Sequence, residues 1–277
     1  MALQPAECTL PNGLRVFYLQ KTTLDVVARE IFEENPYFRH GILVQDGDCI
    51  VDAGANIGMF LLYLNQFLQD AIVHAFEPIP ETFEVLERNV QRHNHLRVEL
   101  HPCGLSSQTG VAKFTHFPRS NVGSTMFPQT SPEFREQTRR QVADSMRNHS
   151  VILKWLMRIT PQVFWWPIIE AIRIHYQKAE QVTCQLRTLS EVIDQRQLTR
   201  IDLLKIDVEG AEQDVLRGIQ PHHWLMIRQL VIEVHHGQQI LQEIDKFLRE
   251  RHFAVVVERP LAATTDQVSM VYAKRVG

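Results

Sequence analysis

The 277-residue sequence predicts an α/β fold in which helices cover both faces of a mostly parallel sheet. From residue 49 onward, short apolar runs typical of buried strands alternate with amphipathic runs typical of helices. At the end of the chain, residues 253–259 and 268–275 both have the composition of strands, with no helix between them. These last two strands are therefore expected to pair antiparallel at one edge of the sheet.

The N-terminal part, residues 1–40, is expected to form a hairpin followed by a helix. The dipeptide Asn12-Gly13 lies between two apolar runs and is a typical hairpin turn. Apolar side chains then recur at helical spacing over residues 22–34. We expect Thr22 or Thr23 to lie near the N-cap of this helix, because a threonine hydroxyl can accept a hydrogen bond from a free backbone N–H.

The elements of the main domain follow in order. The remaining strands are predicted at residues 49–53, 71–78, 96–106, 202–210 and 229–236. The helices between and after them are predicted at residues 59–69, 80–93, 189–195, 211–219 and 238–252. We interpret the whole chain, residues 1–277, as a single domain built on this alternation.

The alternation is interrupted by a long insertion, which we place at residues 117–182. A long insertion in a compact domain is usually functional, and this one contains two predicted helices rich in aromatic residues. One interpretation is a lid or acceptor-binding element, and the other is a packing layer or a homodimer contact. The aromatic residues concerned are Trp155, Trp165, Trp166 and Tyr176.

Composition excludes several functions. The net charge is −3 with 22% charged residues, which argues against a nucleic-acid groove. The most apolar window, Val151–Ile169, contains two basic residues and two prolines, so no transmembrane segment is expected. The start of the chain has no secretion signal, and no two cysteines form a CxxC pair. We therefore expect a cytoplasmic protein whose four cysteines are reduced.

The segment CIVDAGANIGMF shows how a ligand could bind. A strand ends here in a bend that contains Asp52, Gly54, Asn56 and Gly58, and a helix follows. Ligands of open parallel sheets bind at the carboxyl ends of strands, and glycine permits a close approach of the backbone. The bend could also be a tight turn without a ligand. It lacks the GxGxxG pattern of dinucleotide-binding proteins.

The next strand ends in Glu77, a carboxylate placed where two ribose hydroxyls could bond to it. NAD and S-adenosylmethionine are both bound by a bend and a carboxylate of this kind. The aspartate Asp52 at the start of the motif and the missing third glycine favour S-adenosylmethionine, because that cofactor has no pyrophosphate to accommodate.

Acidic and imidazole groups follow two later strands. Asp207 and Glu209 end the strand of LLKIDVEG, and Glu233, His235 and His236 lie at the end of VIEVHH. Helix capping explains one of the first two carboxylates and explains both less well. If the two strands are neighbours, Asp207 and His235 converge at one rim of the sheet, next to the glycine bend.

Taken together, VDAGANIG, AFEP, LLKIDVEGAEQDVLRGI and VIEVH resemble the FkbM-type methyltransferase family. The earlier segment LPNGL fits the one that usually precedes these motifs in that family. The resemblance implies a class I (Rossmann-like) seven-stranded sheet with an antiparallel last strand. It also implies O-methylation with S-adenosylmethionine, commonly of natural products such as polyketides or peptides, sugars or lipid-like acceptors. The cofactor residues that it implies are Asp52, Gly54, Asn56 and Gly58 at the methionine and ribose end, Glu77 at the ribose diol, Cys103, Gly104 and Ser106 beside adenine, and Asp207.

Two schemes fit the acceptor deprotonation that O-methylation requires. In the first, which we favour, His235 or His236 is the general base, oriented by Glu209 or Glu233. In the second, Asp207, Glu209 and His235 hold a divalent cation such as Mg or Mn, which lowers the pKa of the acceptor hydroxyl. His116 is a reserve candidate from the opposite wall. The acceptor is either a free small molecule or one attached to a carrier protein.

Two other functions remain open for the same residues. An NAD-dependent oxidoreductase is the weaker interpretation, because the glycine pattern is not that of a dinucleotide-binding protein and no Tyr-x-x-x-Lys pair follows. A non-catalytic cofactor-binding or carrier-binding module would keep the bend without needing the acid and histidine rim. The bend provides a test: Gly54→Val is expected to abolish cofactor binding in a chain that still folds.

Overall fold

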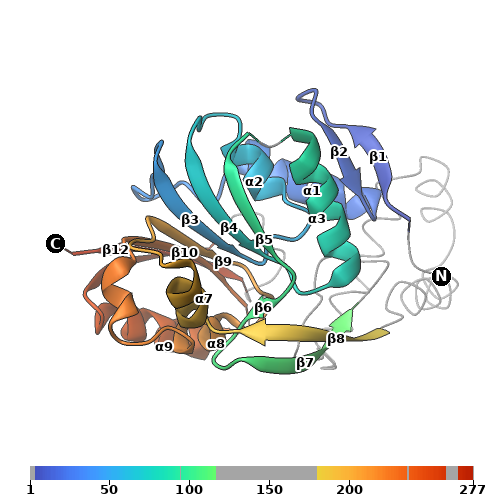
Figure 1. The fold of residues 1–277 in the computed structure, drawn as a ribbon. Helices are drawn as coiled ribbons and strands as arrows, with labels where there is room; N and C mark the ends of the chain where they lie inside the picture. Colours follow the sequence, from blue (N-terminus) through green and yellow to red (C-terminus); the bar gives the residue numbers. More distant parts are fainter. Residues whose placement is uncertain (1–3, 94, 117–179, 236, 260–267, 277) are drawn as a thin grey trace, which may run out of the picture.

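The computed structural model of the chain describes residues 4–93, 95–116, 180–235, 237–259 and 268–276. Its largest unit is a seven-stranded sheet with the strand order β11-β12-β10-β9-β3-β4-β5 (Figure 1). These strands are β3 (Asp48–Ala53), β4 (Ala71–Phe76), β5 (Arg97–His101), β9 (Leu203–Ile206), β10 (Gln229–Val234), β11 (Phe253–Glu258) and β12 (Ser269–Arg275).

Only β12 runs against the other strands of this sheet. It lies between β10 and β11 and pairs antiparallel with both, whereas the other pairs of the sheet are parallel. The predicted antiparallel pair at the end of the chain is therefore confirmed, with β11 as the edge strand. This arrangement also confirms the predicted fold class, a mostly parallel seven-stranded sheet with an antiparallel last strand.

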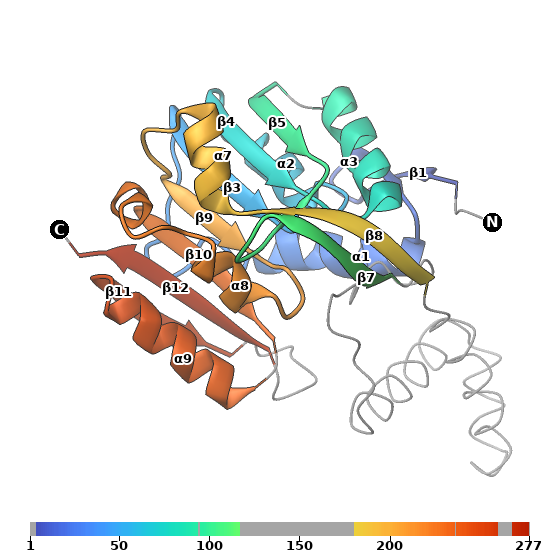
Figure 2. The ribbon, with the colours of Figure 1, turned by 60° about the horizontal axis from the view of Figure 1, so that its bottom comes forward.

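Helices cover both faces of the sheet (Figures 1 and 2). Successive residues of a strand point to opposite faces, so Ile50 and Val51 of β3 belong to two different apolar clusters. On the Ile50 face lie α1 (Lys21–Arg29), the π-helix η1 (Glu30–Glu34), α2 (Met59–Leu64) and α3 (Pro80–His93). On the Val51 face lie α7 (Leu189–Arg196), α8 (Glu212–Arg217), the 3-10 helix η3 (His223–Met226) and α9 (Gln238–Arg249).

The N-terminal hairpin and helix form as predicted, but the helix starts earlier. Strands β1 (Ala6–Thr9) and β2 (Arg15–Tyr18) pair antiparallel around the Asn12-Gly13 turn. The N-cap of α1 is Gln20, so the two threonines expected near the cap lie inside the first turn. An ion pair joins Lys21, in this first turn, to Asp25 one turn further on.

A second, three-stranded sheet was not predicted. Its strands are β6 (Gly104–Leu105), β7 (Gly110–His116) and β8 (Glu180–Arg187), in the order β6-β8-β7. The strand predicted at 96–106 is therefore wrong in its second half. After β5 the backbone leaves the large sheet, because Ser106 N–H donates to the Arg187 carbonyl of β8 at 2.9 Å.

The predicted insertion lies almost wholly outside the described residues, as do its three tryptophans and Tyr176. The structure describes where it departs and returns. His116, the last residue of β7, is paired in register with Glu180, the first residue of β8. The last three residues of the predicted insertion, 180–182, belong to β8.

All four cysteines are free thiols, as expected. Among the described residues, no helix combines the length and the apolar character that crossing a membrane would require.

Candidate cofactor and catalytic site

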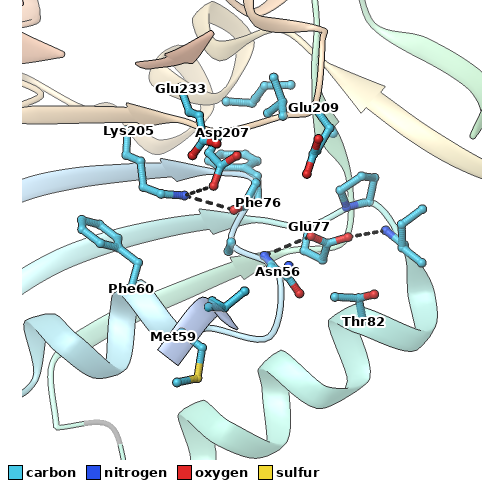
Figure 3. Close-up of a pocket in the computed structure, with 18 of the residues that line it drawn as sticks. Asn56, Met59, Phe60, Phe76, Glu77, Thr82, Lys205, Asp207, Glu209 and Glu233 are labelled. Carbon is cyan, nitrogen blue, oxygen red and sulfur yellow. Dashed lines mark hydrogen bonds and ion pairs between the residues drawn. The ribbon is translucent and has the colours of Figure 1, made fainter. Parts of the chain in front are cut away.

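A pocket lies at the carboxyl ends of the central strands β3, β4, β9 and β10 (Figure 3). It is lined by the bend after β3, the end of β4, the segment that follows β9, and Glu233 of β10. Side chains from α1, η1 and α2 close it from one side, including Val27, Glu30 and Phe60. Because β3 lies between β4 and β9, the chain reverses its direction of travel across the sheet here, which is where open α/β sheets bind ligands.

The predicted bend has the backbone conformation that its residue types favour. Gly54 and Gly58 have φ angles of +84° and +89°, and Asn56 has a φ of +49°. The N–H groups of Gly54 and Ala55 both donate to the carbonyl of Phe76, at 3.1 and 2.9 Å. Asn56 turns its Oδ1 back to the N–H of the next residue at 2.8 Å. The bend is thus fixed to the end of β4, and Gly54, Ala55 and Asn56 line the pocket.

Glu77 is held in the pocket wall by two backbone donors. Its Oε2 accepts from Asn56 N–H at 3.1 Å and its Oε1 accepts from Ile79 N–H at 2.9 Å (Figure 3). Burial raises the pKa of this carboxyl to about 7, although both hydrogen bonds favour the ionised form. Each oxygen retains a lone pair for a further donor. The carboxylate is therefore suited to two neighbouring ligand hydroxyls.

Asp52, predicted as a cofactor residue, lies behind the pocket and does not line it. It is fully buried and its Oδ1 is 2.8 Å from Nζ of Lys205. The Lys205 ammonium also donates to the Gly54 carbonyl at 3.2 Å and lies 3.6 Å from Oδ2 of Asp207 (Figure 3). Burial alone would lower the pKa of Lys205, but the two carboxylates hold it above its usual value. The lysine stays charged and ties the bend to β9.

Four carboxylates converge on the pocket from three elements: Glu30 of η1, Asp207 and Glu209 after β9, and Glu233 of β10. Figure 3 shows Asp207 and Glu233 close to Lys205 and Glu209 further from it. Burial, reinforced by Asp207, raises the pKa of Glu30 to about 7 and that of Glu233 well above its usual value. This excess of carboxylates makes the rim suited to a cationic ligand.

His235 lies against this rim, as predicted, but it does not line the pocket. Its Nδ1 is 3.0 Å from Oε1 of Glu212, and its Nε2 is 3.4 Å from Glu209 and 3.5 Å from Glu233. Burial alone would lower the pKa of His235, but the surrounding carboxylates raise it well above its usual value. A general base must be neutral before it acts. This environment therefore disfavours the predicted role of His235.

A metal-ligand arrangement is also present at the rim. One ligand atom each from Asp207, Glu233 and His235 lies within 4.8 Å of the others. The predicted set had Glu209 in place of Glu233. Lys205 and the imidazolium already supply positive charge to these carboxylates, so the group is held together without an ion.

Only part of the stretch expected beside adenine, residues 103–106, lines the pocket. Gly104 lines the pocket together with the next residue, Leu105. Cys103 and Ser106 are buried and lie outside the lining. A contact from this stretch would therefore come from the backbone and an apolar side chain.

Of the two other predicted histidines, only His116 is among the described residues, and it does not line the pocket. His116 is buried at the end of β7, with its Nε2 3.5 Å from Oε2 of Glu81, and burial lowers its pKa. His236 lies outside the described residues.

The pocket residues that were not predicted include three polar ones, Glu30, Tyr37 and Lys205. The sequence did contain a signal for Lys205, because a lone lysine inside an apolar strand requires a buried counterion. Glu30 and Tyr37 had no comparable signal. They reach the pocket because α1 continues as a π-helix, after which the Tyr37 hydroxyl donates to Oδ2 of Asp207 at 3.4 Å.

A family model described as the methyltransferase FkbM domain matches residues 52–255 of the chain, which contain the bend, Glu77 and the acidic rim. The chain belongs to the FkbM methyltransferase family. It is 33% identical to the 31-O-demethyl-FK506 methyltransferase FkbM of Streptomyces tacrolimicus, over 96% of this chain and 95% of that protein.

Other relatives differ in size from this FkbM-family chain. It is 35% identical to the AMB antimetabolite synthetase AmbE of Pseudomonas aeruginosa, over 83% of this chain but 10% of that protein. A crystal structure of methyltransferase FkbM from Methylobacillus flagellatus KT superposes with a TM-score of 0.51. That match has 16% identity and covers 86% of this chain and 46% of the other. At this identity the structural match supports the fold alone. Family membership makes the protein a methyltransferase.

Proposed function

We propose that this FkbM-family methyltransferase transfers a methyl group from S-adenosylmethionine to a hydroxyl of a natural-product acceptor. The geometry of Glu77 carries the proposal. Both of its oxygens are fixed by backbone N–H groups beside an open glycine bend, which suits a ribose diol. The Streptomyces relative supports an oxygen acceptor, because it is named as a methyltransferase of 31-O-demethyl-FK506.

The charge of the rim favours this cofactor over NAD. When bound, S-adenosylmethionine supplies an electrophilic methyl group on a positively charged sulfonium, and its amino group adds a second cation. Asp207 and Glu209 line the pocket and can balance these charges. The same carboxylates would repel the two negative phosphates of NAD. Glu77 and the bend would hold the ribose, with Gly104 and Leu105 against the base.

The acceptor is placed against the side of the pocket formed by α1, η1 and α2. Val27, Ile31 and Phe60 make this wall apolar, and Glu30 is a carboxylate within it. An alcohol must lose its proton as its oxygen attacks the methyl group. The pKa of Glu30, about 7, suits a group that accepts this proton at neutral pH. We therefore place the general base at Glu30 in preference to His235.

Replacing the proposed base, Glu30→Gln, is expected to lower kcat by about 100-fold, the typical contribution of a general base. The acid limb near pH 7 in the kcat/KM profile should disappear with it, while the Kd for S-adenosylmethionine changes little. The control is Glu33→Gln, an exposed position on the same π-helix, which should leave kcat unchanged. If Glu30→Gln retains the wild-type pH profile, the base lies elsewhere.

The carboxylate proposed to bind the ribose should give a pH-dependent affinity. The ligand 5′-methylthioadenosine has the ribose diol but lacks the sulfonium and the amino group of the methionine part, so it isolates this contact. Because the pKa of Glu77 is about 7, the ionised, accepting form increases as pH rises. Affinity should therefore rise about tenfold between pH 6 and pH 8. Calorimetry of wild type and Glu77→Gln measures this difference.

In Glu77→Gln the single remaining oxygen cannot serve both backbone N–H groups and the diol. Its affinity should be weak at every pH and independent of pH. The control Glu84→Gln, on the exposed side of α3, should follow the wild-type curve. A pH dependence that persists in Glu77→Gln would assign the titration to another group.

The proposed function is tested by binding and product analysis. Calorimetry should show stoichiometric binding of S-adenosylmethionine and S-adenosylhomocysteine, and none of NAD. Purified protein is then incubated with methyl-labelled S-adenosylmethionine and a panel of macrolide polyols, hydroxylated peptides, sugars and hydroxylated lipids. An O-methyl product identified by NMR supports the proposal. Tighter binding of NAD, or methylation at nitrogen alone, would overturn it.

A further inference from the structure

We propose that His74, Glu99 and His101 form a zinc site between β4 and β5, outside the cofactor pocket. His74 lies in β4, directly opposite Glu99 in the register of β5. Glu99 and His101 are two residues apart and share a face of their strand. All three therefore lie on the side of the sheet that α7 covers (Figure 2). None of them lines the pocket.

Two of the three separations between ligand atoms match a tetrahedral ion, and all three atoms lie within 4.8 Å of one another. Nδ1 of His74 is 3.3 Å from Nε2 of His101 and 3.2 Å from Oε2 of Glu99. Zinc bonds of about 2.0–2.1 Å place neighbouring tetrahedral ligands about 3.3 Å apart. Two imidazoles and one carboxylate form a typical zinc ligand set, with the fourth position open to water. This set favours zinc over magnesium or calcium, which prefer oxygen ligands.

Neighbouring residues orient these three side chains. The ring of His101 stacks on Phe76, with centroids 4.3 Å apart and planes 7° from parallel. The second oxygen of Glu99 is paired with Arg196 of α7, which leaves Oε2 facing His74. Outer partners of this kind tune metal affinity. The Glu99 side chain is 35% exposed and gives an ion access from solvent, whereas both histidines are buried.

The same atoms form a poor hydrogen-bond network. Nδ1 of His74 lies near Nε2 of His101 and Oε2 of Glu99, but it carries at most one proton and can donate to only one of them. Nε2 of the same ring has no hydrogen-bond partner among the described residues. An ion at the centre would use the lone pairs that now face one another.

A zinc ion here would act on the fold and not on the reaction. It would join the edge strand β5 to β4 next to Glu77, whose N–H donates to the His101 carbonyl at 3.2 Å. We therefore expect zinc to raise the thermal unfolding temperature of the protein.

The test uses metal-stripped full-length protein titrated with zinc chloride and, separately, with cobalt chloride as a spectroscopic probe. Wild type should bind a single zinc ion per chain, show the visible absorption of four-coordinate cobalt, and unfold at a higher temperature with zinc. Glu99→Gln, at a partly exposed position, and His101→Gln should each weaken zinc binding at least tenfold. In both variants zinc should no longer raise the unfolding temperature.

Two control variants separate this site from other acid and histidine groups. Asp194→Asn alters the group formed with His222 and His223, and Asp207→Asn alters the group at the rim of the pocket. Both should bind zinc as wild type does. Absence of stoichiometric binding, binding unchanged in Glu99→Gln, or binding lost in either control would overturn the proposal. Because Glu99→Gln changes a partly exposed residue, circular dichroism should show it folded even if His101→Gln is not.

Discussion

Gly54→Ala should prevent stable folding, with a loss of more than about 4 kcal/mol in the free energy of unfolding. A Cβ at this position would lie 1.7 Å from the carbonyl oxygen of Asp207 and 2.8 Å from its carbon, in addition to the strain of a φ of +84°. Neither backbone can move away, because Asp207 N–H donates to Ala53 and Gly54 N–H donates to Phe76. Urea unfolding followed by circular dichroism measures the loss.

The control for this variant is Gly47→Ala. Gly47 has nearly the same φ, +85°, but no heavy atom lies within 4 Å of its would-be Cβ. Its free energy of unfolding should fall only by the cost of the backbone conformation, about 1–2 kcal/mol. Equal losses in the two variants would contradict the close-approach argument.

The role of Gly54 differs from the one predicted from the sequence. Gly54→Val was expected to abolish cofactor binding in a chain that still folds. The structure argues against the second part of that expectation, because the side chain would collide with the Asp207 backbone just after β9 and not only with a ligand. A substitution at Gly54 therefore tests the assembly of the sheet, and Glu77 is the better position for testing cofactor binding.

Lys205→Met should lower the free energy of unfolding by about 3–5 kcal/mol at neutral pH, the usual effect of breaking a buried ion pair. The variant leaves Asp52 buried without its cation and removes the donor to the Gly54 carbonyl. Asp52 can then relieve the cost only by taking up a proton. Its folded-state pKa would exceed its unfolded-state value, so the variant should gain stability, relative to wild type, as pH falls from 8 to 5.

A double variant separates the ion pair from simple packing. Lys205→Met with Asp52→Asn removes both charges and should recover part of the loss, so the two effects should not add. Urea unfolding of wild type, both single variants and the double variant at pH 5 and pH 8 gives the complete cycle. A loss in Lys205→Met that is independent of pH and of Asp52 would rule out an unpaired charge.

The sequence predicted the fold well because the large sheet is encoded locally. Apolar runs, helical periodicity and the missing helix before β12 together define its elements. The second sheet could not be predicted in this way. Its longest pairing joins β7 to β8, which are far apart in the chain, and no local pattern marks Gly104–Leu105 as the strand that pairs with β8.

The sequence predicted where the site lies better than it predicted what each residue does. Asp207, Glu209 and Glu233 do converge beside the glycine bend, because adjacent parallel strands end at the same edge. The role of Asp52 depended on Lys205, which faces it across β3 and β9. Such a pairing requires the register of two strands that are far apart in the sequence. The position of Glu30 required knowing that α1 ends in a π-helix.

The pairing of β7 with β8 makes the rest of the fold tolerant of changes in the length of the segment between these strands. The chain leaves the small sheet at His116 and re-enters it at Glu180, its partner in the ladder. The two ends of the intervening segment are therefore held together by the sheet itself. Loop-closure entropy grows only slowly with length, so insertions and deletions between these residues cost the rest of the fold little. Variation in the length of that segment is therefore compatible with the pairing of β7 and β8.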